Sequence, residues 1–394
     1  MKKVWDKWTR IALVKRILVG LILGAILGIA VPQATGIAIL GDVFVSALKA
    51  IAPLLVFFLV ISSLIILYMF STVLAAVIAV FASMAFPVKM TLANAATDTS
   101  APQGIVEVLN NLLLNVVANP VSSLVNANYV GILMWAVLLG LAFRAADKMT
   151  KKVLADVADG ISMVVTWIIN LAPFGIFGLV FNTVSTNGLD IFTTYGKLLL
   201  LLVGCMLFIY FVTNPLLVYW CIRQNPYPLI FHCLKRSALT AFFTRSSAAN
   251  IPVNMKVCEE MGLDRDTYSV TIPLGATINM DGAAITITVM TMATAFTLGI
   301  HVDIPTAIIL SLLAALSACG ASGVAGGSLL LIPMACSLFG ISDDISMQVV
   351  AVGFIIGVVQ DSVETALNSS SDLLLSASAE FRQWRLEGKE IKFK

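Results

Sequence analysis

The sequence predicts an all-α integral membrane protein, because of its composition and because of the length and recurrence of its apolar runs. Hydrophobic residues make up 59% of the 394 residues and charged residues only 12%, and the mean hydropathy is +0.98. An ordinary soluble domain carries about 25% charged residues. The apolar runs are each near the roughly 20 residues that a helix needs to cross the hydrocarbon core, so helices rather than barrel strands are expected to span the bilayer.

The first apolar run, residues 17–31, is predicted to be a transmembrane helix that stays in the protein. Pro32 and further apolar sequence follow it without a clear small-residue cleavage site, which is not the pattern of a secretory signal peptide. Lysine and arginine exceed the acidic residues in residues 1–16 and in the tail after Asp372. Such an excess near span ends marks the cytoplasmic side, so both termini are expected in the cytoplasm and the number of crossings is expected to be even.

The length of the apolar runs also divides the middle of the chain into predicted spans and loops. Residues 44–88 form one apolar run that is too long for a single helix and is predicted to hold two spans. The reversal between them has little room, since residues 61–70, ISSLIILYMF, contain no Gly, Pro or Asn to make a turn. Beyond this run the sequence predicts a loop at 89–104, a broken apolar region at 105–143, a basic turn at 144–152, and spans at 153–180 and 195–219.

Two later segments are predicted to be re-entrant hairpins. They cover residues 229–258 and 306–338, and each has a small, polar or glycine-rich centre followed by a proline: TRSSAANIP at 244–252 and ACGASGVAGGSLLLIP at 318–333. Irregular backbone is not tolerated against lipid but can line a cavity inside the protein. Each hairpin is followed by a span with polar residues at its middle, at 268–296 and at 345–375. This repeated pattern is typical of a transporter with its binding site near the membrane midplane.

Four carboxylates lie in these two polar spans and carry most of the predicted chemistry. A charged side chain at mid-bilayer costs about 2.5 to 3.5 kcal/mol, and Arg245, the nearby basic residue, cannot balance all four. The acids are expected to face a polar cavity and hold cations; alternatively, they share protons with one another or lie at the water interface. In the last span Asp361, Thr365, Asn368 and Asp372 are spaced 4, 3 and 4 residues apart and share one helix face, with Glu364 beside them. On the earlier span the polar residues are Thr277, Asn279, Asp281, Thr286 and Thr288.

The ligands around these acids favour sodium. Carboxylate, amide, hydroxyl and backbone carbonyl oxygens are hard ligands. The chain has only two histidines, His232 and His301, and no cysteine beside the acids. An alkali cation therefore fits better than a transition metal, and sodium is the expected ion. No organic cofactor and no nucleic-acid partner is expected.

Four motifs together resemble the dicarboxylate/amino acid:cation symporter family, which includes the glutamate transporters, and look most like its bacterial sodium/serine-threonine symporters. The motifs are TRSSAANIP, GATINMDGAAITIT, ACGASGVAGG and QDSVETALNSSSD, and the resemblance covers about residues 11–376. It implies a homotrimer in the bacterial cytoplasmic (inner) membrane. Each protomer would have the glutamate-transporter-like elevator fold, with eight transmembrane helices and two re-entrant hairpins in inverted repeats.

The resemblance also implies two domains. A fixed scaffold would comprise residues 1–66, with spans 1 and 2, and residues 105–194, with spans 4 and 5. A moving transport domain would comprise residues 67–104, with span 3 and its loop, and residues 195–394, with span 6, hairpin 1, span 7, hairpin 2, span 8 and the cytoplasmic tail. Family members usually carry a hydrophilic loop between spans 2 and 3, and this chain lacks it. Both a restricted and an unimpaired domain motion remain open.

Substrate-binding residues are implied in the same way. Asp361 would take the substrate ammonium, with Thr365 helping to fix the amino group. Ser246, Ser247 and Asn368 would bind the substrate carboxylate. The tip of the second hairpin, Gly323 to Ser328, would close over the substrate as a gate and would contact it through Gly323, Val324 and Gly326. No residue is expected to be catalytic, because the chain is expected to be a transporter and not an enzyme.

Three sodium sites are implied by the resemblance. Asp281 is thereby expected to be a sodium ligand; a proton-binding or supporting role and a paired structural acid are the alternatives. The first site consists of Asn279, Asn368, Asp372 and the carbonyl of Gly275. The second consists of the carbonyls of Thr277, Ala318, Cys319 and Ala321. The third, found in acidic amino acid transporters, is matched by Tyr68, Ser71, Thr72, Asn279 and Asp281.

Glu364 departs from the family pattern and indicates the substrate. Acidic amino acid transporters place an arginine immediately before the threonine that Thr365 matches, and this arginine clasps a side-chain carboxylate. An anion at that position repels aspartate and glutamate and suits a hydroxyl that donates a hydrogen bond. L-serine and L-threonine, imported with sodium, are therefore expected; other amino acids or dicarboxylates are the alternative. Two other arrangements stay open, in which Glu364 turns away from the pocket or pairs with Arg245.

A remote alternative of another class is an intramembrane serine protease. Residues 320–323, GASG, fit the GxSG signature of such enzymes, in which a histidine on another helix activates the serine. Four residues are a weak signal in a chain rich in Gly, Ala and Ser. The protease hypothesis also leaves the four acids unexplained.

Overall fold

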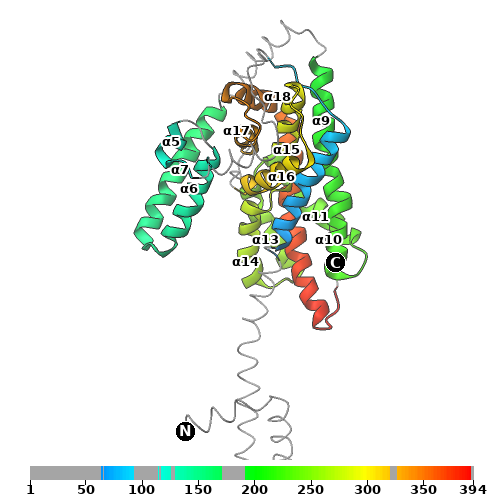
Figure 1. Ribbon diagram of the computed structural model, residues 1–394. Coiled ribbons are helices and arrows are strands. Elements are labelled where there is room, and N and C mark those ends of the chain that lie inside the picture. Colours follow the sequence, from blue (N-terminus) through cyan, green and yellow to red (C-terminus); the bar gives the residue numbers. More distant parts are fainter. Residues whose placement is uncertain are drawn as a thin grey trace, which may run out of the picture. The chain divides into compact units, whose positions relative to one another are not determined.

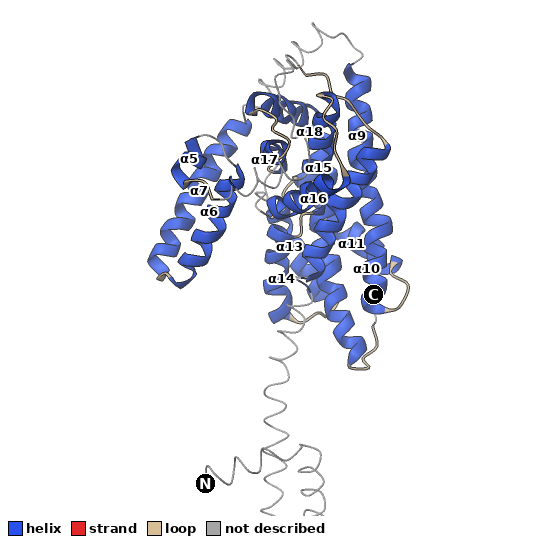
Figure 2. Ribbon diagram, in the orientation of Figure 1, coloured by secondary structure: helices blue, strands red, loops and turns tan. Residues whose placement is uncertain are grey.

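Figure 1 shows the computed structural model of the chain, which describes residues 64, 66–92, 114, 117–125, 129–170, 191–319 and 326–391. The chain divides into two compact units, Met1–Phe58 and Leu59–Lys394, and all described residues belong to the second. They form helices, turns and connecting loops without a strand (Figure 2), which confirms the all-α prediction for the described part. The first predicted span, residues 17–31, lies outside it.

Helices that are long and apolar enough to cross a membrane occur at four places in the described part of the chain. They are Ile66–Ala85, Thr193–Ile222, Arg265–Thr297 and Asp343–Leu386. These helices coincide with the predicted spans 3, 6, 7 and 8. The chain is therefore built as a multi-pass membrane protein.

Residues 120–170 form three α-helices with short connections. They are α5 (Pro120–Val125), α6 (Tyr129–Ala142), which runs into the 3-10 turn η2 (Phe143–Ala145), and α7 (Lys148–Asn170). α7 begins inside the predicted basic turn at 144–152, so this turn is shorter than predicted. The reason is a helix cap at Asp147, whose carboxylate accepts a hydrogen bond of 2.7 Å from the Thr150 amide. Hydrogen bonds from Thr150 also lower the pKa of Asp147.

The predicted span at 195–219 is one continuous helix with a widened turn. It consists of α9 (Ile191–Phe208), the π-helical turn η3 (Ile209–Thr213) and α10 (Asn214–Ile222). Pro215 at the start of α10 has no N–H to donate and would clash with the carbonyl four residues earlier. That carbonyl belongs to Phe211, and the Tyr227 hydroxyl donates a hydrogen bond of 3.3 Å to it.

The first predicted hairpin consists of two helical arms that contact each other. One arm comprises α11 (Tyr227–Cys233), the π-helical turn η4 (Leu234–Ala238) and α12 (Leu239–Thr244), and the other is α13 (Ser247–Glu260). The chain reverses at Arg245 and Ser246. Arg245 adopts a left-handed conformation, with φ of 49°, which costs a residue with a side chain about 1 to 2 kcal/mol. The reversal lies within the predicted centre, 244–252.

The span predicted at 268–296 is broken in the middle. α14 (Arg265–Ile278) ends at Asn279, and α15 (Asp281–Thr297) begins two residues later. Asn279 and Met280 have non-helical dihedral angles. The sequence predicted polar residues at this point but not the interruption. Such breaks leave helix ends and backbone groups free for ligands.

The second hairpin is described except at its tip. α16 (Ile304–Ala318) forms one arm, and the 3-10 turn η5 (Ser328–Leu331) with α17 (Ile332–Ser337) forms the other. Asp303 caps α16 by accepting a hydrogen bond of 3.0 Å from the Thr306 amide. Residues 320–325, which include the first half of the predicted gate, lie outside the described part.

α18 (Asp343–Leu386) forms the centre of the packed core. It contacts α9, α10, α11, α12, α13, α14, α15 and α17 (Figure 1). Asp343 and Asp344 in its first turn and Arg385 in its last turn complement the helix dipole. The helix continues well past the predicted end of the span at Leu375, because residues up to Phe381 are buried against the surrounding helices.

Candidate functional site

The candidate site lies where α18, the break between α14 and α15, and helix Ile66–Ala85 meet. The four acids of the polar spans are buried, with exposed fractions of 0% for Asp281, 4% for Asp361, 5% for Glu364 and 1% for Asp372. None of the four is therefore exposed on the surface of the described part of the chain. Because a buried carboxylate needs hydrogen bonds or a cation, the partners of each acid indicate what it does.

Asp281 accepts hydrogen bonds from two hydroxyl groups of helix Ile66–Ala85. Ser71 Oγ donates to Oδ2 at 2.6 Å, and Thr72 Oγ1 donates to Oδ1 at 3.1 Å. Asp281 is also the first residue of α15, where the positive end of the helix dipole favours a negative charge. The structure thus brings together three residues of the predicted third sodium site.

Asp372 pairs with Asn279 at the helix break. Asn279 Nδ2 donates to Asp372 Oδ1 at 3.0 Å. The remaining polar atom of each side chain, the amide oxygen Asn279 Oδ1 and the carboxylate oxygen Asp372 Oδ2, is buried without a hydrogen-bond partner among the described residues. Buried polar atoms are rarely left without a hydrogen bond, so these two oxygens are available as ligands for a cation. Both residues belong to the predicted first sodium site.

Gly275 lies directly beside this pair. A Cβ atom at Gly275 would come within 2.7 Å of the Tyr68 hydroxyl oxygen and 2.8 Å of Asp372 Oδ1. The absence of a side chain is therefore what lets α14 approach the carboxylate. The Tyr68 hydroxyl also lies 2.9 Å from Ser376 Oγ and 3.1 Å from the Asp372 carbonyl oxygen.

Tyr68 therefore lies on the Asp372 side of the site and not on the Asp281 side. The single hydroxyl hydrogen of Thr72 is shared between the Tyr68 carbonyl oxygen, at 3.0 Å from Oγ1, and Asp281 Oδ1, at 3.1 Å. Asn279, which the resemblance assigns to both the first and the third site, is hydrogen-bonded to Asp372. The predicted first and third sodium sites are thus adjacent and linked through helix Ile66–Ala85.

The predicted second sodium site is described in part. Cys319 Sγ lies 3.6 Å from the Ile278 carbonyl oxygen, which brings the end of α16, with Ala318, to the end of α14. Thr277 Oγ1 donates to the Leu274 carbonyl at 2.7 Å within α14. Ala321 lies outside the described residues.

Asp361 is contacted from both hairpins. The Gly326 amide, from the second hairpin, donates to Oδ1 at 3.2 Å. Arg245 Nη1, from the tip of the first hairpin, lies 3.9 Å from Oδ2. Oδ2 has no hydrogen-bond partner among the described residues. Gly326 has a φ of 76°, a conformation that strongly favours glycine. Gly323 and Val324 lie outside the described residues.

The remaining predicted substrate residues lie at the start of α13 and on α18. Ser246 caps α13, since its Oγ accepts a hydrogen bond of 3.2 Å from the Ala249 amide. Ser247 and Thr365 are buried. Asn368 Oδ1 accepts a hydrogen bond of 2.7 Å from the Gly282 amide in the first turn of α15.

Glu364 points towards α15 and the second hairpin. Its Oε2 accepts hydrogen bonds from Thr286 Oγ1 at 2.7 Å, from Ser328 Oγ at 2.9 Å and from the side-chain amide of Gln360. The ion pair of Arg245 is with Asp361, so the predicted alternative of an Arg245–Glu364 pair is wrong. A Cβ at Gly282 would come within 2.9 Å of Glu364 Cγ, so glycine allows α15 and α18 to approach closely here.

The sequence reasoning missed the side chains that hold Glu364, above all Gln360 and Ser328. Gln360 lies one helical turn before Glu364, at the spacing of neighbouring residues on a helix, and this signal was present in the sequence. The contact of Ser328 had no comparable signal, because the two residues belong to different elements.

It also missed a buried polar cluster between the first hairpin and α18. Asn250 Nδ2 donates to Ser369 Oγ at 2.8 Å and to Ser237 Oγ at 2.9 Å. Asn254 Nδ2 donates to the Ser369 carbonyl at 2.8 Å. These bonds attach α13 to α18. The spacing of the two asparagines on one helix face was the available signal.

Comparisons with known proteins agree with the motif resemblance. The family model of the sodium:dicarboxylate symporter family matches residues 13–380. The chain is also similar to a curated protein named serine/threonine transporter SstT from Bifidobacterium adolescentis, with 57% identity over 406 residues, covering 99% of this chain and 94% of the relative. Because this alignment is longer than the chain of 394 residues, the relative has residues at places where this chain has none.

Proposed function

Because the chain belongs to the sodium:dicarboxylate symporter family, we propose that it imports small neutral hydroxy amino acids, L-serine and L-threonine, together with sodium. The observation that carries the substrate assignment is the 57% identity, over nearly the whole chain, to a relative named serine/threonine transporter. Membership of a symporter family also makes the chain a transporter and not an enzyme. The GASG sequence at 320–323 then needs no protease role.

In the proposed substrate site, the amino acid lies between Asp361 and the tips of the two hairpins. Its ammonium group donates to Asp361 Oδ2, a buried oxygen without a hydrogen-bond partner among the described residues. Arg245 does not occupy this oxygen, since 3.9 Å is too long for a hydrogen bond. The substrate carboxylate binds Ser246, Ser247 and Asn368, and Thr365 helps to fix the amino group. The tip with Gly323, Val324 and Gly326 closes over the substrate.

In the proposed first sodium site, the ion binds Asp372, Asn279, Asn368 and the Gly275 carbonyl. The unpartnered oxygens of Asp372 and Asn279 support this assignment. They are hard ligands and include one full negative charge, as suits a small cation. A sodium ion here also links α14 to α18 across the helix break, so binding of the ion stabilises the site in which the substrate lies.

The other two sodium sites rest on fewer contacts. The carbonyls of Thr277, Ala318, Cys319 and Ala321 would hold the second ion, and the proximity of Cys319 to Ile278 supports this set. Tyr68, Ser71, Thr72, Asn279 and Asp281 would hold the third, supported by the two hydroxyl groups on Asp281. Each hydroxyl oxygen keeps lone pairs for an ion while its hydrogen is donated to the carboxylate.

Glu364 is proposed to select against acidic substrates. Its carboxylate lies one turn from Asp361 on α18, and a second negative charge near the substrate disfavours the side-chain carboxylate of aspartate or glutamate. The three donors on Oε2 stabilise the ionised form in a buried position. Replacement of Glu364 by Arg is expected to abolish serine uptake, and uptake that survives this change would contradict the role.

The finer architecture is part of the same proposal. Residues 1–66 and 105–194 form the scaffold, and residues 67–104 and 195–394 form a transport domain that moves as an elevator within each protomer of a homotrimer. The two hairpins are re-entrant, eight helices span the bacterial cytoplasmic membrane, and both termini are cytoplasmic. The packing of α9 to α17 around α18 supports a compact moving domain.

Uptake of labelled serine into proteoliposomes containing the purified protein tests the function. An inward sodium gradient is compared with an equal potassium gradient and with excess unlabelled aspartate. Uptake that requires sodium and is unaffected by aspartate is the expected result. Uptake that is equal with potassium, or that aspartate suppresses as strongly as serine does, would overturn the proposal.

The short connection between spans 2 and 3 requires a second measurement. Sodium-dependent serine binding is measured in the same preparation, and uptake is compared with that of a variant carrying a hydrophilic loop inserted near residues 61–66. Binding without uptake in the original chain, with uptake in the loop variant, would assign the defect to restricted motion. Equal uptake by the two proteins would show that the loop is dispensable.

A further inference from the structure

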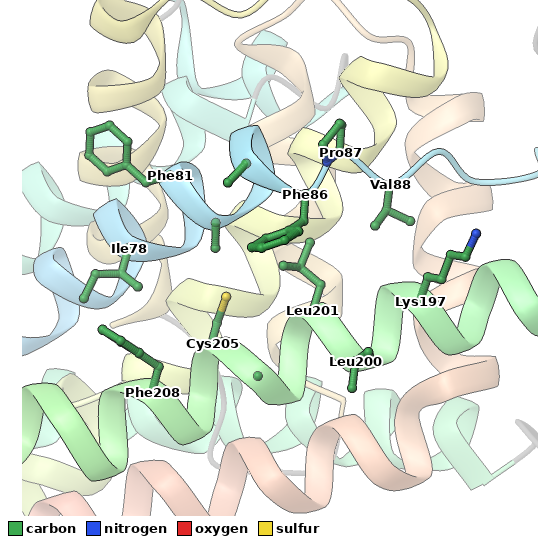
Figure 3. A pocket seen from close by; sticks show the side chains of 13 residues that line it. Ile78, Phe81, Phe86, Pro87, Val88, Lys197, Leu200, Leu201, Cys205 and Phe208 are labelled. Atoms are coloured by element: carbon green, nitrogen blue, oxygen red, sulfur yellow. The ribbon is translucent and has the colours of Figure 1, made fainter.

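An apolar groove separate from the transport site runs between helix Ile66–Ala85 and α9 (Figure 3). Its volume is about 910 Å³, and all of its lining residues except Lys197 lack a charge. Several large side chains in it are exposed: 53% for Phe81, 69% for Phe86, 75% for Leu200 and 47% for Phe208. On helix Ile66–Ala85 the groove is lined by Ile78, Phe81, Ala82 and Ala85, which lie further along the helix than Ser71 and Thr72 of the sodium cluster.

The length of the groove corresponds to one leaflet of a bilayer. On α9 its lining extends from Lys197 to Phe208, which at the rise of an α-helix is about 16 Å. The hydrocarbon core of a bilayer is about 30 Å thick, so one leaflet accounts for about 15 Å. An acyl chain that lies along the groove would therefore be covered over its full depth in one leaflet.

Two lysines lie at one end of this groove. Lys197 is exposed and has no hydrogen bond or ion pair among the described residues. Figure 3 shows it near Val88, and the next residue, Lys89, is exposed as well. At the opposite end lie Ile78 and Phe208. A lysine at the boundary of the hydrocarbon region extends its ammonium group towards the headgroups, where it attracts anionic lipid phosphates.

We propose that this groove binds an anionic glycerophospholipid, with an acyl chain along the aromatic and leucine side chains and the headgroup phosphate at Lys197 and Lys89. The apolar lining alone would accept any lipid tail. Lys197 and Lys89, neither of which forms an ion pair with another described residue, make the site selective for a negative headgroup. The bound lipid holds helix Ile66–Ala85 against α9, and the same helix supplies Ser71 and Thr72 to Asp281.

The test measures lipid binding and does not depend on transport activity. The full-length protein in detergent is titrated with phosphatidylglycerol or with phosphatidylcholine of the same acyl chains, and bound lipid is counted by native mass spectrometry. Each lysine near an anionic headgroup contributes about 1 kcal/mol, so Lys197→Gln should weaken phosphatidylglycerol binding about fivefold. Lys152→Gln, which changes an exposed lysine on α7, is the control and should leave binding unchanged.

A second pair of variants tests the contribution of the apolar groove independently of the lysines. A Cβ at Gly204, which lines the groove, meets no atom within 4 Å, so a side chain can extend from this position into the groove. Gly204→Leu should therefore remove binding of both lipids there. Gly196 lies on the same helix, also meets nothing within 4 Å and does not line the groove, so Gly196→Leu is the matched control.

Three results would overturn the proposal. Equal binding of the two lipids by the unaltered protein would mean that the groove only contacts bulk lipid and does not select an anionic headgroup. Equal binding by the Lys197→Gln and Lys152→Gln proteins would remove the role of Lys197. Equal binding by the two leucine variants would mean that the groove is not the lipid site, as when another segment of this chain covers it.

Discussion

The four buried acids fall into two pairs that differ in how their oxygens are used. Asp281 accepts a hydrogen bond on each oxygen, and Glu364 accepts three on Oε2. Asp361 and Asp372 each have one buried oxygen without a hydrogen-bond partner among the described residues. All four carboxylates are nearly equally buried. Burial therefore does not separate the pairs, whereas their hydrogen bonds do.

This difference indicates that the two pairs of acids have different roles. A buried oxygen without a hydrogen bond costs folding free energy unless a ligand binds to it. Asp361 and Asp372 are therefore the acids best placed to bind a cationic ligand, either sodium or the substrate ammonium. Asp281 and Glu364 are already stabilised by neighbouring side chains. We infer that Glu364 acts mainly by placing negative charge and by connecting helices, and that Asp281 contributes less to sodium binding than Asp372. Replacing each acid by its amide tests this comparison directly.

The largest effect is expected for Asp361→Asn. Loss of the charge that pairs with the substrate ammonium in a buried site costs about 2 kcal/mol or more, equivalent to at least about a 30-fold weaker apparent affinity. Sodium-dependent uptake of labelled serine over a range of serine concentrations measures it. Glu364→Gln, the matched amide substitution one turn away, is the control. A serine affinity within threefold of the original in Asp361→Asn would remove Asp361 from the ammonium site.

A smaller but still strong effect is expected for Asp372→Asn. The variant loses the only full charge of the proposed first sodium site while keeping the size of the side chain. A hydrogen bond or ligand contact to a charged group contributes about 1.5 to 3 kcal/mol, so the sodium concentration for half-maximal serine binding should rise at least tenfold. Serine binding measured against sodium concentration at constant ionic strength gives this value. An unchanged sodium dependence would contradict the site.

A moderate effect is expected for Glu364→Gln. The amide oxygen still accepts hydrogen bonds from Thr286 and Ser328, so serine uptake should stay within a few-fold of the original protein. Removal of the negative charge should make aspartate a better competitor. Competition of unlabelled aspartate with labelled serine measures this change. If aspartate competes equally poorly with both proteins, the charge of Glu364 does not select the substrate.

The smallest effect is expected for Asp281→Asn. Ser71 and Thr72 can still donate to the amide oxygen, but a negative charge is lost from the N-terminus of α15. Sodium affinity or the cooperativity of sodium binding should decrease by a few-fold, and less than in Asp372→Asn. Both variants are measured in the same sodium titration. A larger loss in Asp281→Asn than in Asp372→Asn would reverse the division between the two pairs.

The fold was predictable in its main features from local patterns. The reversal of the first hairpin occurs at Arg245 and Ser246, inside the segment that its polar centre indicated. The break between α14 and α15 was not predicted, because it contains no proline and because Asn279 and Asp281 indicated a binding site rather than the end of a helix. The α14–α18 pairing at Gly275 likewise depends on a neighbour that is distant in sequence.

The candidate site shows the same limit. Asp361 and Glu364 are three residues apart on one helix, and their spacing placed them side by side. Asp361 nevertheless meets Gly326 and Arg245, whereas Glu364 meets Thr286 and Ser328. Helical spacing defines a face of a helix, but it does not define which other helix covers each part of that face.

By itself, the sequence determined that this is a helical membrane protein and that its acids gather on two polar spans, since hydropathy and helical periodicity are local properties. Its motifs also identified the family that the full-length comparison confirms. Only the tertiary structure decided which acids are fully hydrogen-bonded by neighbouring side chains and which keep an oxygen without a hydrogen-bond partner among the described residues. Hydrogen bonds between Ser71 and Asp281 or between Asn279 and Asp372 join residues far apart in the chain, and they exist only once the helices have packed.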